Sequence, residues 1–212
     1  MKTTVTKNDL SDLSSDDPKV KYRRARSLVA IARQNPAQLY PHLTTLTRLL
    51  RSENKIMKWA AIDIIGYVAS IDKGGKTDRL LGRLCGLLHE GQLITANHAI
   101  GALTNFALAN PGHQKRVTQA LLGVERHTYG TKECHNIALG KAIQGMSLYA
   151  NRLRPDTRVL AFVNRQTTNP RAATRKKAQK FLDVLGTRVK KGASHNEINT
   201  PDGSAHTDGS IR

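Results

Sequence analysis

A repeat of about 38 residues is the feature that most constrains the fold of this chain. Its apolar residues recur at helical spacing, without the sustained period-two alternation that a strand needs. When the predicted helices are aligned, three columns of mostly apolar residues keep one register. The columns are Ala25, Ile62, Ile100, Gly140 and Ala178; Leu28, Ile65, Leu103, Ile143 and Phe181; and Ile31, Val68, Phe106, Met146 and Val184. Such a repeat is typical of helical solenoids, whose units bury their apolar faces against one another.

Aspartate or asparagine followed by proline marks several predicted helix starts. The Asx side chain can accept hydrogen bonds from the first-turn amides, and proline fits the first helical position because it has no amide to lose. These dipeptides are Asp17-Pro18, Asn35-Pro36, Asn110-Pro111 and Asn169-Pro170. We expect further starts at Ser52 and Thr131, and helix stops at Gly74-Gly75 and Gly130.

These marks predict an all-α domain of about five helix pairs. The pairs are Lys7 to Ser15 (a weak helix) with Pro18 to Gln34, Pro36 to Arg51 with Glu53 to Ile71, Lys76 to His89 with Gln92 to Ala109, Pro111 to His127 with Lys132 to Ala150, and Pro155 to Thr167 with Pro170 to Leu185. We expect an N-terminal segment over 1–16, a repeat domain over 17–186 and a disordered tail over 187–212, because the tail is polar and lacks aromatic residues.

Both helix types of the repeat resemble those of the HEAT-repeat family. The second helices VKYRRARSLVAIA and IMKWAAIDIIGYVA are similar to its basic, small-residue and leucine-rich pattern, and LYPHLTTLTRLL and LLGRLCGLL are similar to its first helix. The resemblance covers roughly residues 17–185 and implies a HEAT-like α-α superhelix, an armadillo-type solenoid whose second helices line the concave side. It also extends distantly to the DNA-alkylation-repair repeat proteins, which hold damaged duplex DNA on that side.

The chain is strongly basic, with a formal net charge of +18. Positive charge gathers at the two ends of the repeat domain, which indicates affinity for a polyanion. The alternative is a structural role, because the terminal repeats of a solenoid need polar outer faces. The candidate partner- or phosphate-binding residues are Lys19, Arg23, Arg26, Arg33, Lys58, Arg175, Lys176, Lys177 and Lys180.

A second candidate site lies on the second helices of the middle repeats. Trp59 and Asp63 are one turn apart. The resemblance to the alkylation-repair proteins implies a role for this pair, because aromatic and acidic side chains meet the extruded or damaged nucleotide in those proteins. Tyr22 shares the column of Trp59, which favours an aromatic packing position instead. Asn97 and His98 belong to a polar, nearly uncharged stretch that would either grip a partner or satisfy neighbouring backbone groups.

No motif for catalysis or metal binding emerges from the sequence. Cys134 and His135 are adjacent and point about 100° apart on a helix, so we expect no metal site. Close helix contact is the expected reason for the helical glycines, which are Gly82, Gly86, Gly101, Gly140 and Gly145. We expect no cofactor and no small-molecule substrate, and an enzyme is the less favoured interpretation.

The leading hypothesis is a non-catalytic scaffold that binds an acidic protein or peptide on a basic concave surface. The alternative is a nucleic-acid-binding protein with DNA-alkylation-repair-like chemistry at Trp59 and Asp63. An anionic membrane surface is a third, less favoured partner. The N-terminus lacks the apolar region of a signal peptide, and the two cysteines suggest no disulfide framework, so we expect a cytoplasmic protein.

Overall fold

A computed structural model describes residues 15–150 and 156–196 together with residues 5, 10 and 13, and the side chains only as far as residue 185. The α-helices are α2 (Pro18–Gln34), α3 (Leu43–Leu49), α4 (Lys55–Val68), α5 (Asp78–Leu87), α6 (Leu93–Ala109), α7 (Pro111–Gly123), α8 (Lys132–Tyr149), α9 (Thr157–Arg165) and α10 (Ala172–Asn196). Short 3-10 turns are η2 (Pro36–Gln38), η3 (Tyr40–His42), η4 (Ala69–Ile71), η5 (Val124–Arg126) and η7 (Gln166–Thr168). Over this part of the chain, no residue lies in a β-strand.

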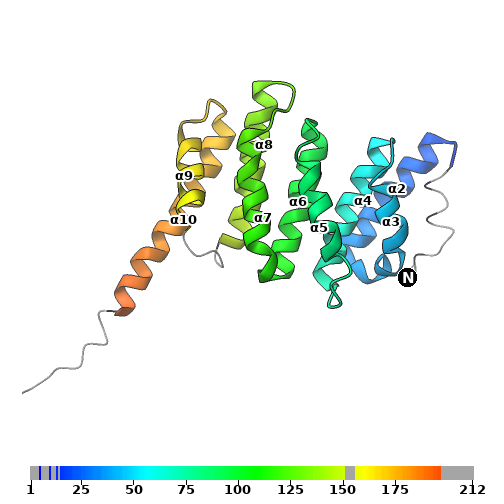
Figure 1. The fold of residues 1–212 in the computed structure, drawn as a ribbon, viewed down its shortest axis with the longest axis horizontal. Coiled ribbons are helices and arrows are strands. Elements are labelled where there is room, and N and C mark those ends of the chain that lie inside the picture. Colours follow the sequence, from blue (N-terminus) through cyan, green and yellow to red (C-terminus); the bar gives the residue numbers. More distant parts are fainter. Residues whose placement is uncertain (1–4, 6–9, 11–12, 14, 151–155, 197–212) are drawn as a thin grey trace, which may run out of the picture.

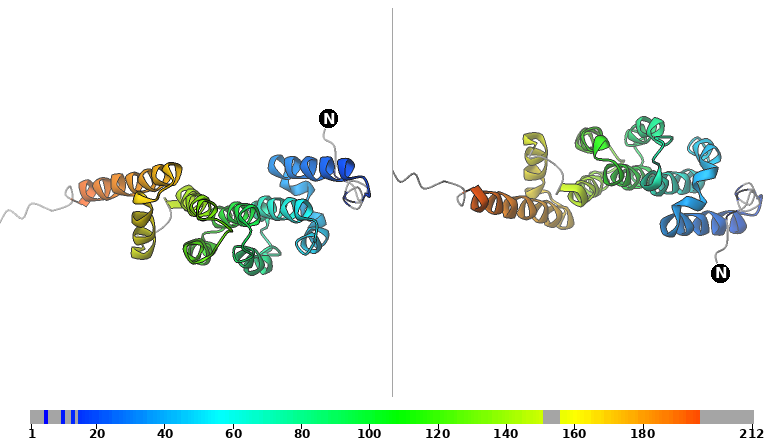
Figure 2. Two further views of the ribbon diagram at one scale, coloured as in Figure 1. Left: turned by 90° about the horizontal axis from the view of Figure 1, so that it is seen from above. Right: turned by 90° about the horizontal axis from the view of Figure 1, so that it is seen from below.

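The helices form two layers of an elongated all-α solenoid (Figure 1). One layer is a continuous row in which α2, α4, α6, α8 and α10 pack against one another in chain order. The shorter helices α3, α5, α7 and α9 cover one side of this row (Figure 2). The row bends so that α2 and α10 project on the opposite, uncovered side, which is therefore the concave face (Figure 2).

The core follows the columns that the repeat predicts. In the first column, Ala25, Ile62, Ile100, Gly140 and Ala178 are all buried. The second column is buried in every helix of the row. The third is buried from Val68 to Met146 but not at its ends, since Ile31 is half-buried and Val184 is 37% exposed. The terminal helices lack a neighbour on one side, so their apolar faces are covered less completely.

Side-chain caps begin most of the helices. Asp17 accepts a hydrogen bond from Lys19 N at 2.8 Å, and Asn110 accepts one from Gly112 N at 2.8 Å. Thr131 accepts from Cys134 N at 3.1 Å and begins α8, as predicted. The start predicted at Ser52 lies two residues later, because Asn54 Oδ1 accepts from two first-turn amides of α4.

The helix predicted from Pro36 to Arg51 is broken in the structure. Asn35 makes no side-chain cap there, and two 3-10 turns, η2 and η3, come before the short helix α3. Pro41 lies in η3 and explains the break. Proline has no N–H to donate, and its ring collides with the carbonyl group four residues earlier in an α-helix.

The C-terminal boundary also differs from the prediction. The backbone of α10 continues to Asn196, so the tail expected to be disordered from residue 187 begins as helix. Arg188 and Lys190 have good helix propensity, so a polar segment that contains them is compatible with a helix as well as with a disordered tail. No proline occurs in this segment to end the helix. Residues 197–212 and most of the weak helix predicted at Lys7 to Ser15 lie outside the described residues.

Candidate functional site

The centre of the concave face contains an open cavity of about 240 Å³. Its walls come from three neighbouring helices of the row, α4, α6 and α8. The lining residues are Asp63, Tyr67, Asn97, Ile100, Gly101, Ala102, Thr104, Asn105, Lys141, Gln144, Gly145 and Leu148. The cavity therefore combines amide groups, one carboxylate, one ammonium group and apolar surface.

Glycines bring the cavity helices close together. A Cβ atom on Gly66 would lie 2.7 Å from the Cα atom of Ala102, and one on Gly145 would lie 2.5 Å from the hydroxyl of Thr104. These two glycines therefore allow α4 and α8 to pack closely on α6. Close contact was predicted for Gly145 but not for Gly66, and the same prediction is wrong for Gly86, where a Cβ would meet no atom within 4 Å. It is also wrong for Gly101, because a Cβ there would meet no atom within 4 Å either.

Asn97 supplies an unsatisfied polar atom at the cavity. Its Oδ1 is buried and accepts no hydrogen bond in the described structure. A buried carbonyl without a donor costs about 1–3 kcal/mol. Asn105 and Gln144 place two further side-chain amides around the same space.

Trp59, Asp63 and His98 form one cluster between α4 and α6. The rings of Trp59 and His98 stack with centroids 5.5 Å apart and planes within 12°. His98 Nδ1 lies 2.8 Å from Asp63 Oδ1, and Trp59 Nε1 donates to Thr95 Oγ1 at 3.0 Å. All three predicted side chains are therefore engaged across the repeat boundary, and Asp63 also lines the cavity.

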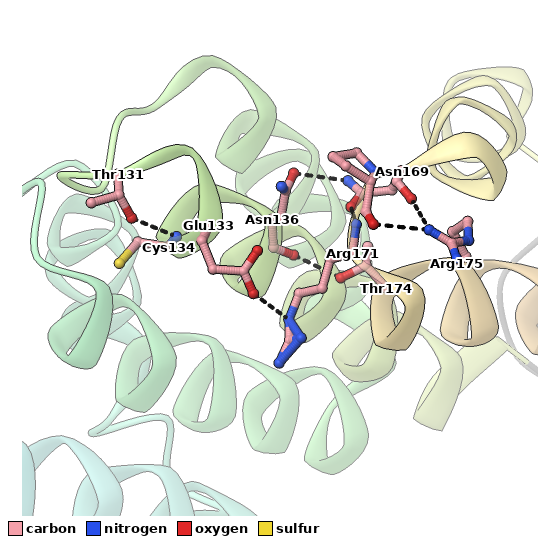
Figure 3. Close-up of polar contacts among 9 residues, drawn as sticks. Thr131, Glu133, Cys134, Asn136, Asn169, Arg171, Thr174 and Arg175 are labelled. Carbon is pink, nitrogen blue, oxygen red and sulfur yellow. Dashed lines mark hydrogen bonds and ion pairs between the residues drawn. The ribbon is translucent and has the colours of Figure 1, made fainter.

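A polar network joins the first turns of α8 to the start of α10 (Figure 3). Asn169 Nδ2 donates to Asn136 Oδ1 at 3.0 Å, and Thr174 Oγ1 donates to the carbonyl of Asn136 at 2.8 Å. Arg175 donates through Nη1 to the carbonyl of Asn169 at 2.8 Å. Arg171 Nε lies 3.3 Å from Glu133 Oε1 (Figure 3). Arg175, a predicted partner-binding residue, thus closes the turn before α10.

Positive charge gathers where α8 meets α10. Burial, together with the nearby charges of Lys141 and Arg171, lowers the pKa of Lys177. Lys141 is exposed and lines the cavity, and no ion pair joins it to a carboxylate among the described residues. Lys176 and Lys180 are exposed on α10. Lys141, Arg171 and Lys177 therefore lie near one another where these two helices pack.

The basic residues predicted on α2 are exposed to solvent. These residues are Lys19, Arg23, Arg26 and Arg33. In the described ranges, no carboxylate forms an ion pair with any of these four side chains. Lys58 on α4 is different, since its Nζ lies 3.5 Å from Glu90 Oε2. The structure therefore separates the predicted basic residues into two groups at the ends of the row, with Lys58 paired between them.

Sequence reasoning missed several lining residues, namely Tyr67, Gly101, Lys141, Gln144 and Leu148. The register contains a signal for two of them. Asp63, Gly101 and Lys141 each follow a member of the first buried column by one residue. Positions next to a core column on a helix lie about 100° from it, which here is the concave side.

Histidines cluster at the edge of the solenoid, outside the cavity. The rings of His89 and His127 meet edge to face with centroids 3.9 Å apart. Burial and the neighbouring groups His89, Arg126 and His135 lower the pKa of His127.

In the portion of the chain that the structure covers, no three metal-ligating side chains come together. Within the same portion, no helix is long and apolar enough to cross a membrane.

Comparison with known proteins gives matches at the level of structure. Neither a protein-family model nor a curated protein matches the chain. A designed armadillo repeat protein in complex with the peptide (KR)4 is similar with a TM-score of 0.59 and 18% identity, over 82% of this chain and 79% of that chain. An engineered protein is similar with a TM-score of 0.52 and 19% identity, over 84% and 78% of the two chains.

At these identities the likeness concerns the fold alone. The resemblance to HEAT repeats and to DNA-alkylation-repair proteins stays a prediction. The two helix layers, the continuous row from α2 to α10 and the structural matches agree with one another. The chain is an all-α solenoid of the armadillo type.

Proposed function

We propose that the protein is a non-catalytic scaffold that binds an extended acidic peptide segment along its concave face. The observation that carries this proposal is the cavity shared by α4, α6 and α8, with the side-chain amides of Asn105 and Gln144 and the ammonium group of Lys141 among its lining groups. Extended concave surfaces are the binding surfaces of solenoid proteins.

The mixture of lining groups suits a peptide. A peptide backbone offers N–H and C=O groups at every residue, which match the side-chain amides of Asn97, Asn105 and Gln144. Neighbouring helices lie about 8–10 Å apart and an extended chain advances about 3.3 Å per residue, so each repeat would meet two or three peptide residues. A peptide crossing the three cavity helices would engage all three amides.

The charge of the surroundings favours an acidic segment. Lys141 lines the cavity, the charge of Lys141 helps to lower the pKa of Lys177 on α10, and the exposed arginines of α2 lie at the other end of the row. Asp63 is the carboxylate of the cavity, and it is held by His98. The designed neighbour is in complex with the basic peptide (KR)4, and the partner proposed for this chain differs from that peptide in the sign of its charge.

The test is binding of a fluorescein-labelled peptide of alternating Glu and Ser, measured by fluorescence anisotropy at low and physiological salt. Lys141→Glu should weaken binding at least about tenfold, a loss of about 1.4 kcal/mol. Lys115→Glu is the matched control, because Lys115 is exposed on α7 in the covering layer and changes the net charge equally.

Either of two results would overturn the proposal. One is the absence of binding to the acidic peptide at low salt by the wild-type protein. The other is an equal loss of affinity in Lys141→Glu and Lys115→Glu, which would mean that only the net charge attracts the peptide. Binding to an Arg-Lys peptide as strong as to the Glu-Ser peptide would show that the site does not select the acidic charge of the proposed partner.

Nucleic-acid binding is a second candidate, favoured by the exposed basic stripe of α2. Lys19, Arg23 and Arg26 have no carboxylate partner among the described residues and would contact phosphates. Binding of short labelled DNA and RNA across a salt series tests this candidate. A steep dependence on salt that flattens in Arg23→Glu would support it, while a slope unchanged by the substitution would contradict it.

A further inference from the structure

Gly101 lines the concave cavity, and close helix packing does not explain why this residue is a glycine. Gly66, Gly140 and Gly145 all face atoms that a Cβ would strike, at 2.7, 2.6 and 2.5 Å. Gly101 lies near the middle of α6 and is exposed, and a Cβ on it would enter open space. A glycine inside a helix lowers stability relative to alanine. The effect of the missing side chain at this position is an open cavity.

The walls beside Gly101 are partly apolar and unusually exposed. Leu148 on α8 is 62% exposed, although large aliphatic side chains are commonly buried. Tyr67 stands on the α4 side, and Ile100 and Ala102 flank Gly101 on α6. The cavity measures about 240 Å³, which equals the volume of about eight water molecules at about 30 Å³ each in the liquid. This space is large enough for one large side chain.

We propose that Gly101 determines specificity by opening a subsite for one large apolar side chain of the bound peptide. The inference rests on the proposed function, because the peptide is what carries this side chain into the cavity. The occupant is a phenylalanine- or leucine-like residue beside an acidic residue. Its side chain lies over Gly101 between Tyr67 and Leu148, and the neighbouring carboxylate faces Lys141.

The polar groups of the cavity favour a peptide residue over a free apolar molecule. The side-chain amides of Asn105 and Gln144 line the cavity and can exchange hydrogen bonds with the peptide groups next to the inserted side chain. Lys141 at the same cavity needs a counter-charge, which an acidic neighbour in the peptide supplies. A hydrocarbon or lipid tail would leave these groups unpaired, and unpaired polar groups in a covered site oppose binding.

The experiment compares two labelled peptides on three proteins. The peptides are an alternating Glu-Ser sequence with Phe at its centre and the same sequence with Ala there. The proteins are the wild type, Gly101→Leu and Gly86→Leu. Gly86 is the matched control, because it lies in α5 of the covering layer and is exposed, and a Cβ on it would also meet no atom within 4 Å. Circular dichroism and thermal melting check that each variant is folded.

The expected result is that the wild type and Gly86→Leu prefer the Phe peptide by about tenfold, since burial of an aromatic ring is strongly favourable. Gly101→Leu should lose this preference and keep its affinity for the Ala peptide within about threefold, because the Glu side chains still meet Lys141.

The failures of the two proposals are distinguishable. Equal wild-type affinity for the two peptides would overturn the subsite and leave the acidic groove intact. A Phe preference that persists in folded Gly101→Leu would overturn the role of Gly101. A wild-type protein that binds neither peptide would overturn both proposals.

Discussion

Two glycines in neighbouring helices of the row should respond in opposite ways to alanine. The Cβ of Gly66→Ala would lie 2.7 Å from the Cα and 2.9 Å from the Cβ of Ala102, and neither atom can move by a side-chain rotation. Overpacking of this kind costs about 1–3 kcal/mol. Alanine recovers about 0.8–1.0 kcal/mol of helix propensity, so we expect a net loss of up to about 2 kcal/mol.

Gly101→Ala has the same propensity gain without the collision, so it should stabilise the protein by up to about 1 kcal/mol. For a chain of 212 residues, each kcal/mol changes the Tm by about 2–4 °C. The propensity gain is common to both variants, so they differ by the overpacking cost of about 1–3 kcal/mol, which corresponds to roughly 2–12 °C in Tm.

Thermal melting followed by circular dichroism, with urea unfolding to compare the slopes m, measures the effect. A change in the urea midpoint without a change in m shows that stability itself has changed. If Gly66→Ala melted as high as Gly101→Ala, the proposed contact between α4 and α6 would be wrong.

Three further predictions follow from caps and titrating groups. Asn54→Ala should cost about 1 kcal/mol in urea unfolding, because Asn54 caps two amides of α4, while Ser52→Ala should cost less because Ser52 accepts only from Asn54 N. The pKa of His127 is lowered in the folded protein, so below pH 6.5 the unfolded state takes up the proton more readily and the free energy of unfolding should fall as the pH decreases. His127→Gln should weaken this pH dependence. A free energy of unfolding that depends on pH in the same way in His127→Gln and the wild type would contradict the prediction. Burial raises the pKa of Tyr129 and Tyr149 from 10.0 to about 12, so stability should fall as the pH rises through that interval; ultraviolet titration showing all tyrosines ionised near pH 10 in the folded protein would disprove this.

Much of the fold is readable from the sequence because it depends on local pattern. Apolar residues at helical spacing define helices, and a constant register from Ala25 to Ala178 shows that the helices stack in the same way. Asp17, Asn110 and Thr131 cap helices where predicted, since capping needs only neighbouring backbone amides. Pro41 is also visible in the sequence, but the helical period around it conceals the break.

The candidate site was only partly predictable. Asp63, Asn97 and His98 stand out for their polarity within apolar helices, and two of them line the cavity. The pairing of His98 with Asp63 joins residues 35 positions apart and needs the relative rotation of α4 and α6. Charge alone did not distinguish Lys58, which pairs with Glu90, from the other predicted basic residues.

The sequence by itself determined that this chain stacks helix pairs, which residues form the core and where the positive charge lies. Those properties follow from spacing along the chain and from the number of charges. The tertiary structure alone decided that Gly101 opens a cavity while Gly66 and Gly145 close contacts. The same residue type has opposite effects because what surrounds a missing side chain is set by helices from other repeats, whose distance and rotation no local pattern specifies.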